Sequence, residues 1–426
     1  MTSDSDFVSG FFVSLGSPEE VAARPEPAGG RLRVNAHIHL PPNFSAFDSV
    51  EQAVRLAVEQ GVRVVGVSNY YDYTVYTDFA RRATEAGLFP LFGIEIIALL
   101  DDLLKAGIRI NDPGNPGKMY ICGKGISRFS PLSDEAADLL QVIRDKDSAR
   151  MAAMVEKLAA LCAAAGLDLG VDEAAVIDGV VRRHGCARET VYLQERHVAQ
   201  AFEEAIARSV PAQERSATLE RLFGAPSKAP LDPLTVQAEI RSHLMKAGKP
   251  AYTEETFVGF EHAVRLILAL GGIPCYPVVA DGARPILPFE ENVDALVQEM
   301  AARNLHCVEF IPNRNSPEVL VRYARALRSA GLAVTAGTEH NTPELLPIEP
   351  RCAGGAPVPE EAAALFWEGA CVVAAHQFLR FSGRAGFVDD QGRPDPAHAT
   401  PHDRIAAYAA LGARVIDAAM AHRAEA

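Results

Sequence analysis

The chain has 426 residues, of which 48% are hydrophobic and 23% are charged, a balance too apolar for a disordered protein and too evenly polar for a membrane protein. Its 41 basic and 55 acidic residues give a net charge of -14, and without a visible basic patch this charge argues against non-specific nucleic-acid binding. The seven cysteines include no C-x-x-C pair, so they indicate neither a disulfide framework nor a zinc knuckle and favour a reducing compartment.

The N-terminal segment lacks the features of a targeting or membrane segment. Its apolar part, Phe7 to Leu15, has no basic flank and is too short to span a bilayer. We therefore expect a cytoplasmic protein without a membrane partner. The sequence indicates no particular oligomeric state.

From Arg31 onwards, short β-branched runs alternate with amphipathic stretches, the pattern of parallel strands joined by crossover helices. Strands are predicted at residues 32–39, 62–68, 89–97, 119–122, 273–279, 306–311 and 333–338. Helices between them are predicted at residues 50–60, 77–86, 257–270, 292–303 and 317–329. This alternation predicts an α/β fold, a distorted, TIM-like (β/α) barrel of seven strands.

A segment of roughly 120 residues separates the fourth and fifth predicted strands, far longer than ordinary connections in compact domains. It is rich in Ala, Leu, Glu and Arg, which favour helices. Because it leaves one strand end and returns before the next strand, we expect it to cap the C-terminal mouth of the barrel. The expected division is an N-terminal extension at 1–30, the barrel at 31–130 and 253–341, the inserted helical cap at 131–252 and a helical C-terminal extension at 342–426.

Potential metal ligands gather where predicted strands end. His37 and His39 close the first strand, and period-2 alternation places both imidazoles on one face. Glu95 lies near the end of the third strand and Glu339 follows the last one, at the C-terminal ends where barrel enzymes assemble their sites. Two imidazoles and two carboxylates suit zinc, manganese or iron, with a position open for water or substrate.

The order of these motifs resembles that of the PHP (polymerase and histidinol phosphatase) superfamily of metal-dependent phosphoesterases, which have a distorted barrel of seven strands. The family's opening D-x-H-x-H, its G-I-E and its closing G-S-D-x-H are similar to residues 35–39, 93–95 and 337–341. Its G-G-I-P-V-L-A-H-P motif resembles residues 271–277. The inserted segment is similar to that of the branch acting on nucleoside phosphates and short oligonucleotides, whose R-P-H-I-A resembles residues 195–199 and whose P-A-Y resembles 250–252.

The resemblance implies one complete metal site. Family members build up to three, and the matching positions here hold His37, His39, Glu95 and Glu339, the last in place of Asp. His340 could replace a lost ligand if the loop shifts by one residue. One divalent ion per chain, zinc, manganese or iron, is therefore expected.

Tyrosines stand at other positions that match metal-binding histidines of the family. These are Tyr70, Tyr120 and Tyr276, while the family's final histidine matches Asn341. A neutral phenol, whose pKa is about 10, binds divalent metals less well than imidazole but donates hydrogen bonds to a phosphate or sugar. The expected site is thus a single ion ringed by tyrosines.

Two further residues are candidates for the site. His197 lies on an amphipathic helix of the inserted segment and could be an ordinary hydrogen-bonded core histidine, but the resemblance favours a position facing the site. Glu309 is acidic within an apolar strand, and a carboxylate is costly to bury unless it is paired or bound to metal. We therefore expect Glu309 to face the site as well.

These observations predict a phosphoesterase-like, metal-dependent hydrolase of a small phosphorylated substrate, in which the ion polarises a phosphoryl oxygen and activates water. Glu95 would serve catalysis as a ligand, while His197, Tyr120 and Tyr276 would orient the anion. Two alternatives stay open. One is a non-catalytic binding or regulatory module, and the other is a single-metal isomerase or lyase acting on a sugar-like hydroxy compound, since one ion and several phenols also suit polarisation of a carbonyl.

Overall fold

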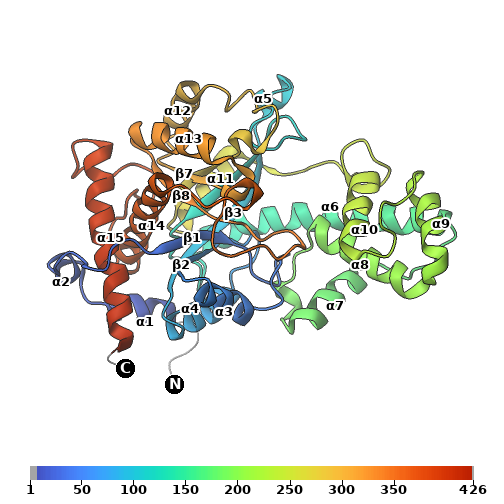
Figure 1. The fold of residues 1–426 in the computed structure, drawn as a ribbon, viewed down its shortest axis with the longest axis horizontal. Coiled ribbons are helices and arrows are strands. Elements are labelled where there is room, and N and C mark those ends of the chain that lie inside the picture. The colour runs from blue at the N-terminus through green and yellow to red at the C-terminus, as the bar shows by residue number, and fades with distance from the viewer. Residues whose placement is uncertain (1–6, 425–426) are drawn as a thin grey trace.

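Within residues 7–424, which the computed structural model describes, seven strands form a nearly closed barrel surrounded by helices (Figure 1). In chain order they are β1 (Arg33–Ile38), β2 (Val62–Val67), β3 (Phe89–Leu99), β4 (Lys118–Lys124), β6 (Ile273–Val278), β7 (Cys307–Phe310) and β8 (Ala333–Ala336). They pair in this order, and a short β5 (Val258–Gly259) adds to β3. The predicted distorted barrel is confirmed.

The first and last strands meet through the loop that follows β8. The backbone N–H of Thr338 donates to the carbonyl of His37 at 3.0 Å, and that of His39 donates to the carbonyl of Glu339 at 2.8 Å. These bonds fix the end of β1 against the end of the last strand. The predicted site motifs at residues 35–39 and 337–341 are thereby joined through their backbones.

Strand β4 departs from the predicted parallel arrangement, because it runs antiparallel to both β3 and β6. The link between β3 and β4 contains only the five-residue helix α5 (Asp101–Lys105). A parallel connection needs a long crossover, usually a helix that packs on the sheet, and this link provides none. As a result β4 ends beside the middle of β3, where Lys124 pairs with Gly93.

The helices predicted around the barrel are confirmed to within a few residues, at α3 (Val50–Glu59), α4 (Val75–Glu85), α11 (Phe260–Ala269), α12 (Val293–Ala302) and α13 (Pro317–Ser329). Helix α3 shows why they form. Its backbone begins after Ser49, whose side chain accepts from the Gln52 backbone N–H, and its buried side chains are Val50, Ala53, Val54 and Ala57. This spacing directs one apolar face to the barrel.

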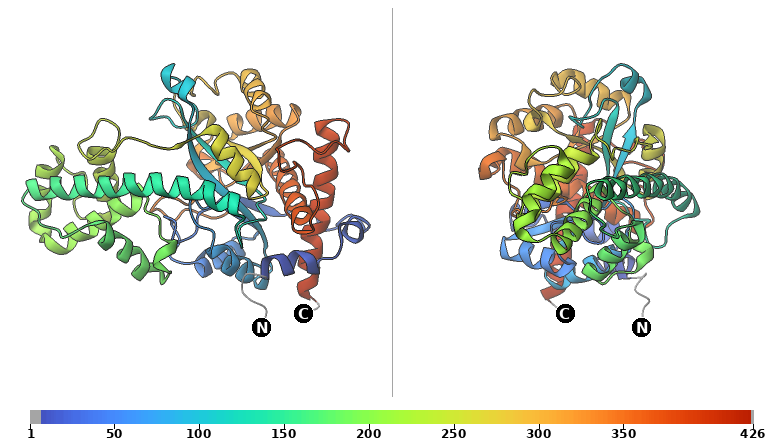
Figure 2. Two further views of the ribbon diagram at one scale, coloured as in Figure 1. Left: turned by 180° about the vertical axis from the view of Figure 1, so that it is seen from behind. Right: turned by 90° about the vertical axis from the view of Figure 1, so that its right-hand side faces the viewer.

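The long segment between β4 and β5 contains α6 (Asp134–Ala164), α7 (Glu173–His184), α8 (Glu195–Ser209), α9 (Ala212–Phe223) and α10 (Pro233–Ile240). These helices have a hydrophobic core of their own. Helix α6 runs from the barrel into this group (Figure 2). It buries Leu140 in the barrel core and Met154 in the second core, so a single rigid element connects the two.

Two long helices, α14 (Glu360–Phe381) and α15 (Pro401–Ala424), pack together on one side of the barrel (Figure 1). By length and composition α14 could span a membrane, but 67% of its apolar window is buried inside the protein, as in a core helix. The N-terminal helix α1 (Phe7–Ser14) joins this packing, because the Phe12 ring stacks on Phe381 with 4.7 Å between centroids. Residues 1–6 of the predicted N-terminal extension lie outside the described residues.

Candidate metal centre

Three predicted ligands converge in a buried group at the end of β1 and within β3. His39 Nε2 lies 3.0 Å from Glu95 Oε2, and His37 Nε2 lies 3.2 Å from His39 Nε2 and 3.6 Å from the same carboxylate oxygen. All three residues are buried, and together they form a group that can hold a metal ion. Two imidazoles and one carboxylate are a donor set typical of open, catalytic zinc sites.

The orientation of His37 supports this interpretation. Its Nδ1 lies 2.6 Å from Glu309 Oε2, so Nδ1 donates to the carboxylate and Nε2 is the ring nitrogen that faces His39 and Glu95. Burial lowers the pKa of His37, but the nearby Glu309 carboxylate outweighs it and raises the pKa well above its usual value. A carboxylate behind a ligating histidine fixes its ring and tautomer in many metal sites.

Glu309 is in turn held by Lys124, whose Nζ lies 2.6 Å from Glu309 Oε1. Burial raises the pKa of Glu309, yet Lys124 and then His37 outweigh it and keep the carboxyl ionised. Cys122, His37 and Glu309 form a second possible ligand group, but an ammonium ion already neutralises its carboxylate. Glu309 therefore belongs to the site as predicted, as a partner of His37.

Glu339, predicted as a metal ligand, does not join the converging group. Its carboxylate forms an ion pair with Arg314 and accepts a hydrogen bond from Asn341 Nδ2 at 3.2 Å. The next residue, His340, is turned away. Its Nδ1 lies 2.6 Å from Thr338 Oγ1, its Nε2 lies 2.9 Å from the Leu346 carbonyl, and its ring stacks on Phe47. The proposed replacement of a ligand by His340 is therefore not supported.

The predicted tyrosines divide into two sets. Tyr70 stacks on His39, with 5.0 Å between ring centroids, and both Tyr70 and Tyr120 line a cavity at the metal centre. Burial raises the pKa of Tyr120 to about 12, so its phenol is a neutral donor. Tyr276 is placed differently, because its hydroxyl donates to Glu290 Oε1 at 2.7 Å within the core. Tyr276 was expected at the site, but it is not among the residues that line the cavity.

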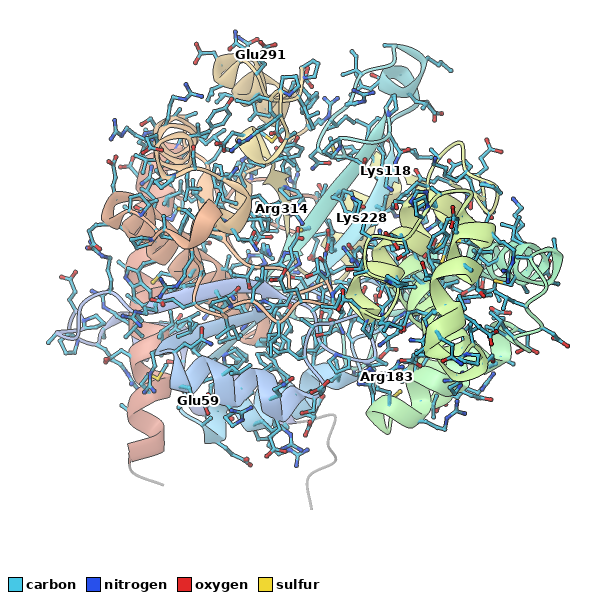
Figure 3. All side chains as sticks on the ribbon, turned by 45° about the vertical axis from the view of Figure 1, so that its right-hand side comes forward. Glu59, Lys118, Arg183, Lys228, Glu291 and Arg314 are labelled. Atoms are coloured by element: carbon cyan, nitrogen blue, oxygen red, sulfur yellow. The ribbon has the colours of Figure 1, made fainter. Side chains whose placement is uncertain are left out.

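The cavity has a volume of about 260 Å³ and lies between the barrel and the inserted helices. Both regions contribute charged side chains, and Figure 3 labels Lys118 and Arg314 close to their junction. The basic residues that line the cavity are Lys118, Arg150, Arg196, Arg241, Lys246 and Arg314, and the acidic ones are Glu95, Asp112, Asp147, Glu195 and Glu339. This cavity is therefore rich in charge of both signs.

Most of the basic side chains are already neutralised. Lys118 Nζ lies 2.8 Å from Glu255 Oε1, and Glu195 pairs with Lys246 at 2.7 Å. Arg196 differs, since it forms no ion pair with any residue between 7 and 424. Burial lowers the pKa of Arg196 to about 10. A partly desolvated, uncompensated guanidinium favours binding of an anion.

His197, the residue after Arg196, is not among the residues that line the cavity. Its Nδ1 accepts a hydrogen bond from the Gln194 backbone N–H at 3.1 Å, and its ring packs against the edge of Phe44. Burial lowers the pKa of His197 to about 3. It is therefore a neutral histidine buried beneath the cavity wall, whereas the neighbouring Arg196 lines the cavity.

Sequence reasoning missed Lys124, Arg196 and Arg314. Lys124 ends an apolar strand, so the argument that selected Glu309 could also have selected it. Arg314 follows β7 in the short 3₁₀ turn η5 (Pro312–Arg314), at the barrel end where site residues were sought. Arg196 carried no local signal.

Comparison with solved structures finds chains that resemble this one. A provisionally named metal-dependent phosphoesterase from Bifidobacterium adolescentis is 18% identical, with a TM-score of 0.52 over 81% of this chain and 98% of that one. An amidohydrolase from Chromobacterium violaceum, solved with sulfate and no metal, is 16% identical, with a TM-score of 0.48 over 78% and 96% of the two chains. Comparisons with protein-family models and with curated proteins give no match. At these identities the likeness to the first structure shows a common fold.

Proposed function

We propose that this protein is a metal-dependent hydrolase of a small phosphorylated substrate, working with one divalent ion. The observation that carries the proposal is the buried group of His37, His39 and Glu95, because Glu95 lines a cavity that also holds the Arg196 guanidinium, which has no ion-pair partner within the described residues. The shared fold with a protein named as a metal-dependent phosphoesterase agrees with it. A volume of about 260 Å³ is at the small end of ligand sites and favours a small substrate.

His37, His39 and Glu95 would hold the ion, which when bound supplies Lewis-acid polarisation and lowers the pKa of water. Glu309 keeps the proton of His37 on Nδ1, away from the ligand position. Arg196 binds the negative charge of the phosphoryl group, and the neutral phenol of Tyr120 donates a hydrogen bond to a substrate oxygen. These contacts orient the substrate and stabilise charge that develops in the transition state.

The isomerase or lyase alternative keeps one specific support, because two neutral phenols, Tyr70 and Tyr120, line the cavity. An ion together with such donors could polarise a carbonyl group. Release of inorganic phosphate distinguishes hydrolysis from this reaction.

The test is metal-dependent phosphate release from a panel of sugar phosphates, nucleotides and short oligonucleotides. We expect activity on at least one compound, loss of it in Glu95→Gln, and loss of bound metal in His37→Ala. Glu360→Gln, which changes a surface carboxylate paired with Arg31, is the matched control and should behave as wild type. A metal-loaded protein that releases no phosphate from the panel would favour the isomerase or lyase, and a protein that takes up no metal would favour a binding module.

A further inference from the structure

Arg314 brings a second cationic group to the metal centre. It follows β7 at the barrel mouth, it lines the cavity, and its guanidinium pairs with Glu339. Its side chain is 43% exposed, whereas that of Glu339 is 8% exposed. Both residues line the cavity, but the guanidinium is much more exposed than the carboxylate behind it.

Glu339 is held rigidly by its backbone. Its φ of 59° lies in the left-handed region, which is costly for a residue with a side chain unless the surroundings hold it there. Two hydrogen bonds with β1 do so, from Glu339 N–H to the His37 carbonyl and from His39 N–H to the Glu339 carbonyl, each 2.8 Å. Its carboxylate is occupied by Arg314 and Asn341. This arrangement suits a carboxylate that positions a guanidinium.

The charges around the site support the same assignment. The Lys124 ammonium neutralises Glu309 and the Arg314 guanidinium neutralises Glu339. Glu95 differs from these two carboxylates. Within the described residues its ion-pair partners are histidines, and it pairs with no lysine or arginine. A divalent ion at His37, His39 and Glu95 therefore meets one uncompensated carboxylate, which favours a single ion.

We propose that Arg314 is a catalytic residue that binds a substrate oxyanion beside the metal, and that Glu339 is its positioning residue rather than a metal ligand. This inference rests on the proposed function. It adds the Arg314 guanidinium as the second positive charge that binds the phosphoryl group. A guanidinium has five N–H donors, and the ion pair with Glu339 leaves others free for a phosphoryl oxygen. Hydrolases with two metal ions use the second charge to clamp the attacking and leaving oxygens, and Arg314 supplies such a charge from the chain itself.

The first experiment separates the two roles of Glu339 by metal content. Purified wild type, Glu339→Gln and His37→Ala are loaded with zinc or manganese, and bound metal is measured by elemental analysis and chelator competition. We expect Glu339→Gln to keep the wild-type content of one ion, and His37→Ala to lose it. Loss of the ion from folded Glu339→Gln, or two ions in wild type, overturns the assignment.

The second experiment measures the affinity of the metal-loaded protein for inorganic phosphate by calorimetry. Losing hydrogen bonds to a charged partner weakens binding about ten- to a hundredfold, so Arg314→Met should lower the affinity by that factor at unchanged metal content. Arg314→Lys should restore part of it. The matched control is Arg325→Met, since Arg325 forms a two-point pair with Glu361 on the surface, and it should bind phosphate as wild type does.

Wild-type phosphate affinity in Arg314→Met contradicts the inference, whatever the activity of the protein. The proposed function fails in a different way, by the absence of phosphate release from every compound of the panel. For a hydrolysed compound, Arg314→Met should lower kcat as well as raise KM, because a contact that strengthens in the transition state affects both. A rise in KM alone would assign Arg314 to substrate binding only and overturn its catalytic role.

Discussion

At the scale of single residues, the metal centre depends on the chain of contacts from Lys124 through Glu309 to His37. Each link is 2.6 Å long and all three side chains are buried. Buried charges are tolerated when they are paired, but removing one partner leaves the other uncompensated. These contacts therefore orient the His37 ring, and they also contribute to the stability of the barrel.

The first prediction concerns Glu309→Gln, which removes the charge and keeps a side chain of similar shape. We expect metal affinity to fall about ten- to a hundredfold, as for other partners of metal-bound histidines. The free energy of unfolding should fall by about 3 kcal/mol or more, because the Lys124 ammonium is left buried and unpaired. Chelator competition and urea unfolding measure the two effects. The double variant Glu309→Gln/Lys124→Met should recover stability, and equal loss in both variants would contradict the explanation.

The second prediction concerns Glu290, the partner of Tyr276. Burial raises the pKa of Glu290 to about 7, above its ordinary value of 4.5. The folded state thus holds a proton that the unfolded chain releases at lower pH, so this contribution to stability is complete below pH 4.5 and is lost as pH rises towards 7. Its size is about 3 kcal/mol at most. Urea unfolding at several pH values should show a smaller decrease over this range in Glu290→Gln than in wild type.

At the scale of elements, close helix packing depends on one glycine. A Cβ placed on Gly412 of α15 would overlap the Cys371 carbonyl oxygen of α14, whereas one placed on Gly179 of α7 would meet nothing within 4 Å. The two glycines therefore have opposite consequences. Gly412 allows the backbones to touch, and Gly179 only lowers helix propensity.

The third prediction follows from this contrast. Gly412→Ala should lower the free energy of unfolding by about 2 kcal/mol or more, because α15 must move away from α14. Gly179→Ala should raise it by about 0.5 to 1 kcal/mol through helix propensity. Chemical unfolding of the two variants beside wild type measures both changes. If Gly412→Ala had the free energy of unfolding of wild type, the backbones of α14 and α15 would not be in contact.

At the scale of the whole molecule, the centre joins regions far apart in the sequence. The candidate ligands come from β1, the residue after it and β3, the supporting charges from β4 and β7, and the far wall of the cavity from α6 and α8. A ligand bound at such a junction stabilises the native arrangement as a whole, because it binds the folded state and not the unfolded one.

The fourth prediction is that the divalent ion raises thermal stability. At a free ion concentration of about 100 times Kd, the gain in the free energy of unfolding is about 2.7 kcal/mol, and a chelator should reverse it. Calorimetric melting curves with zinc, manganese and chelator measure the change. His37→Ala should show no such gain, and a metal-induced rise that persists in His37→Ala would place the ion elsewhere.

The sequence by itself determined the seven barrel strands, the helices between them and the candidate ligands His37, His39 and Glu95. These features depend on local periodicity and on strand ends, which neighbouring residues set. The antiparallel direction of β4, by contrast, follows from the length of helix α5 and from pairing with strands on both sides. No local pattern within β4 distinguishes the two directions.

Only the tertiary structure decided which other side chains face the centre. Tyr276 turns to Glu290, His340 to the Leu346 carbonyl, and Glu339 to Arg314. The direction of a side chain at a strand end depends on the backbone of its loop and on partners from other elements. The left-handed backbone at Glu339 and His340 is fixed by hydrogen bonds to β1, some 300 residues earlier in the sequence, and such a constraint has no signature in the residues around it.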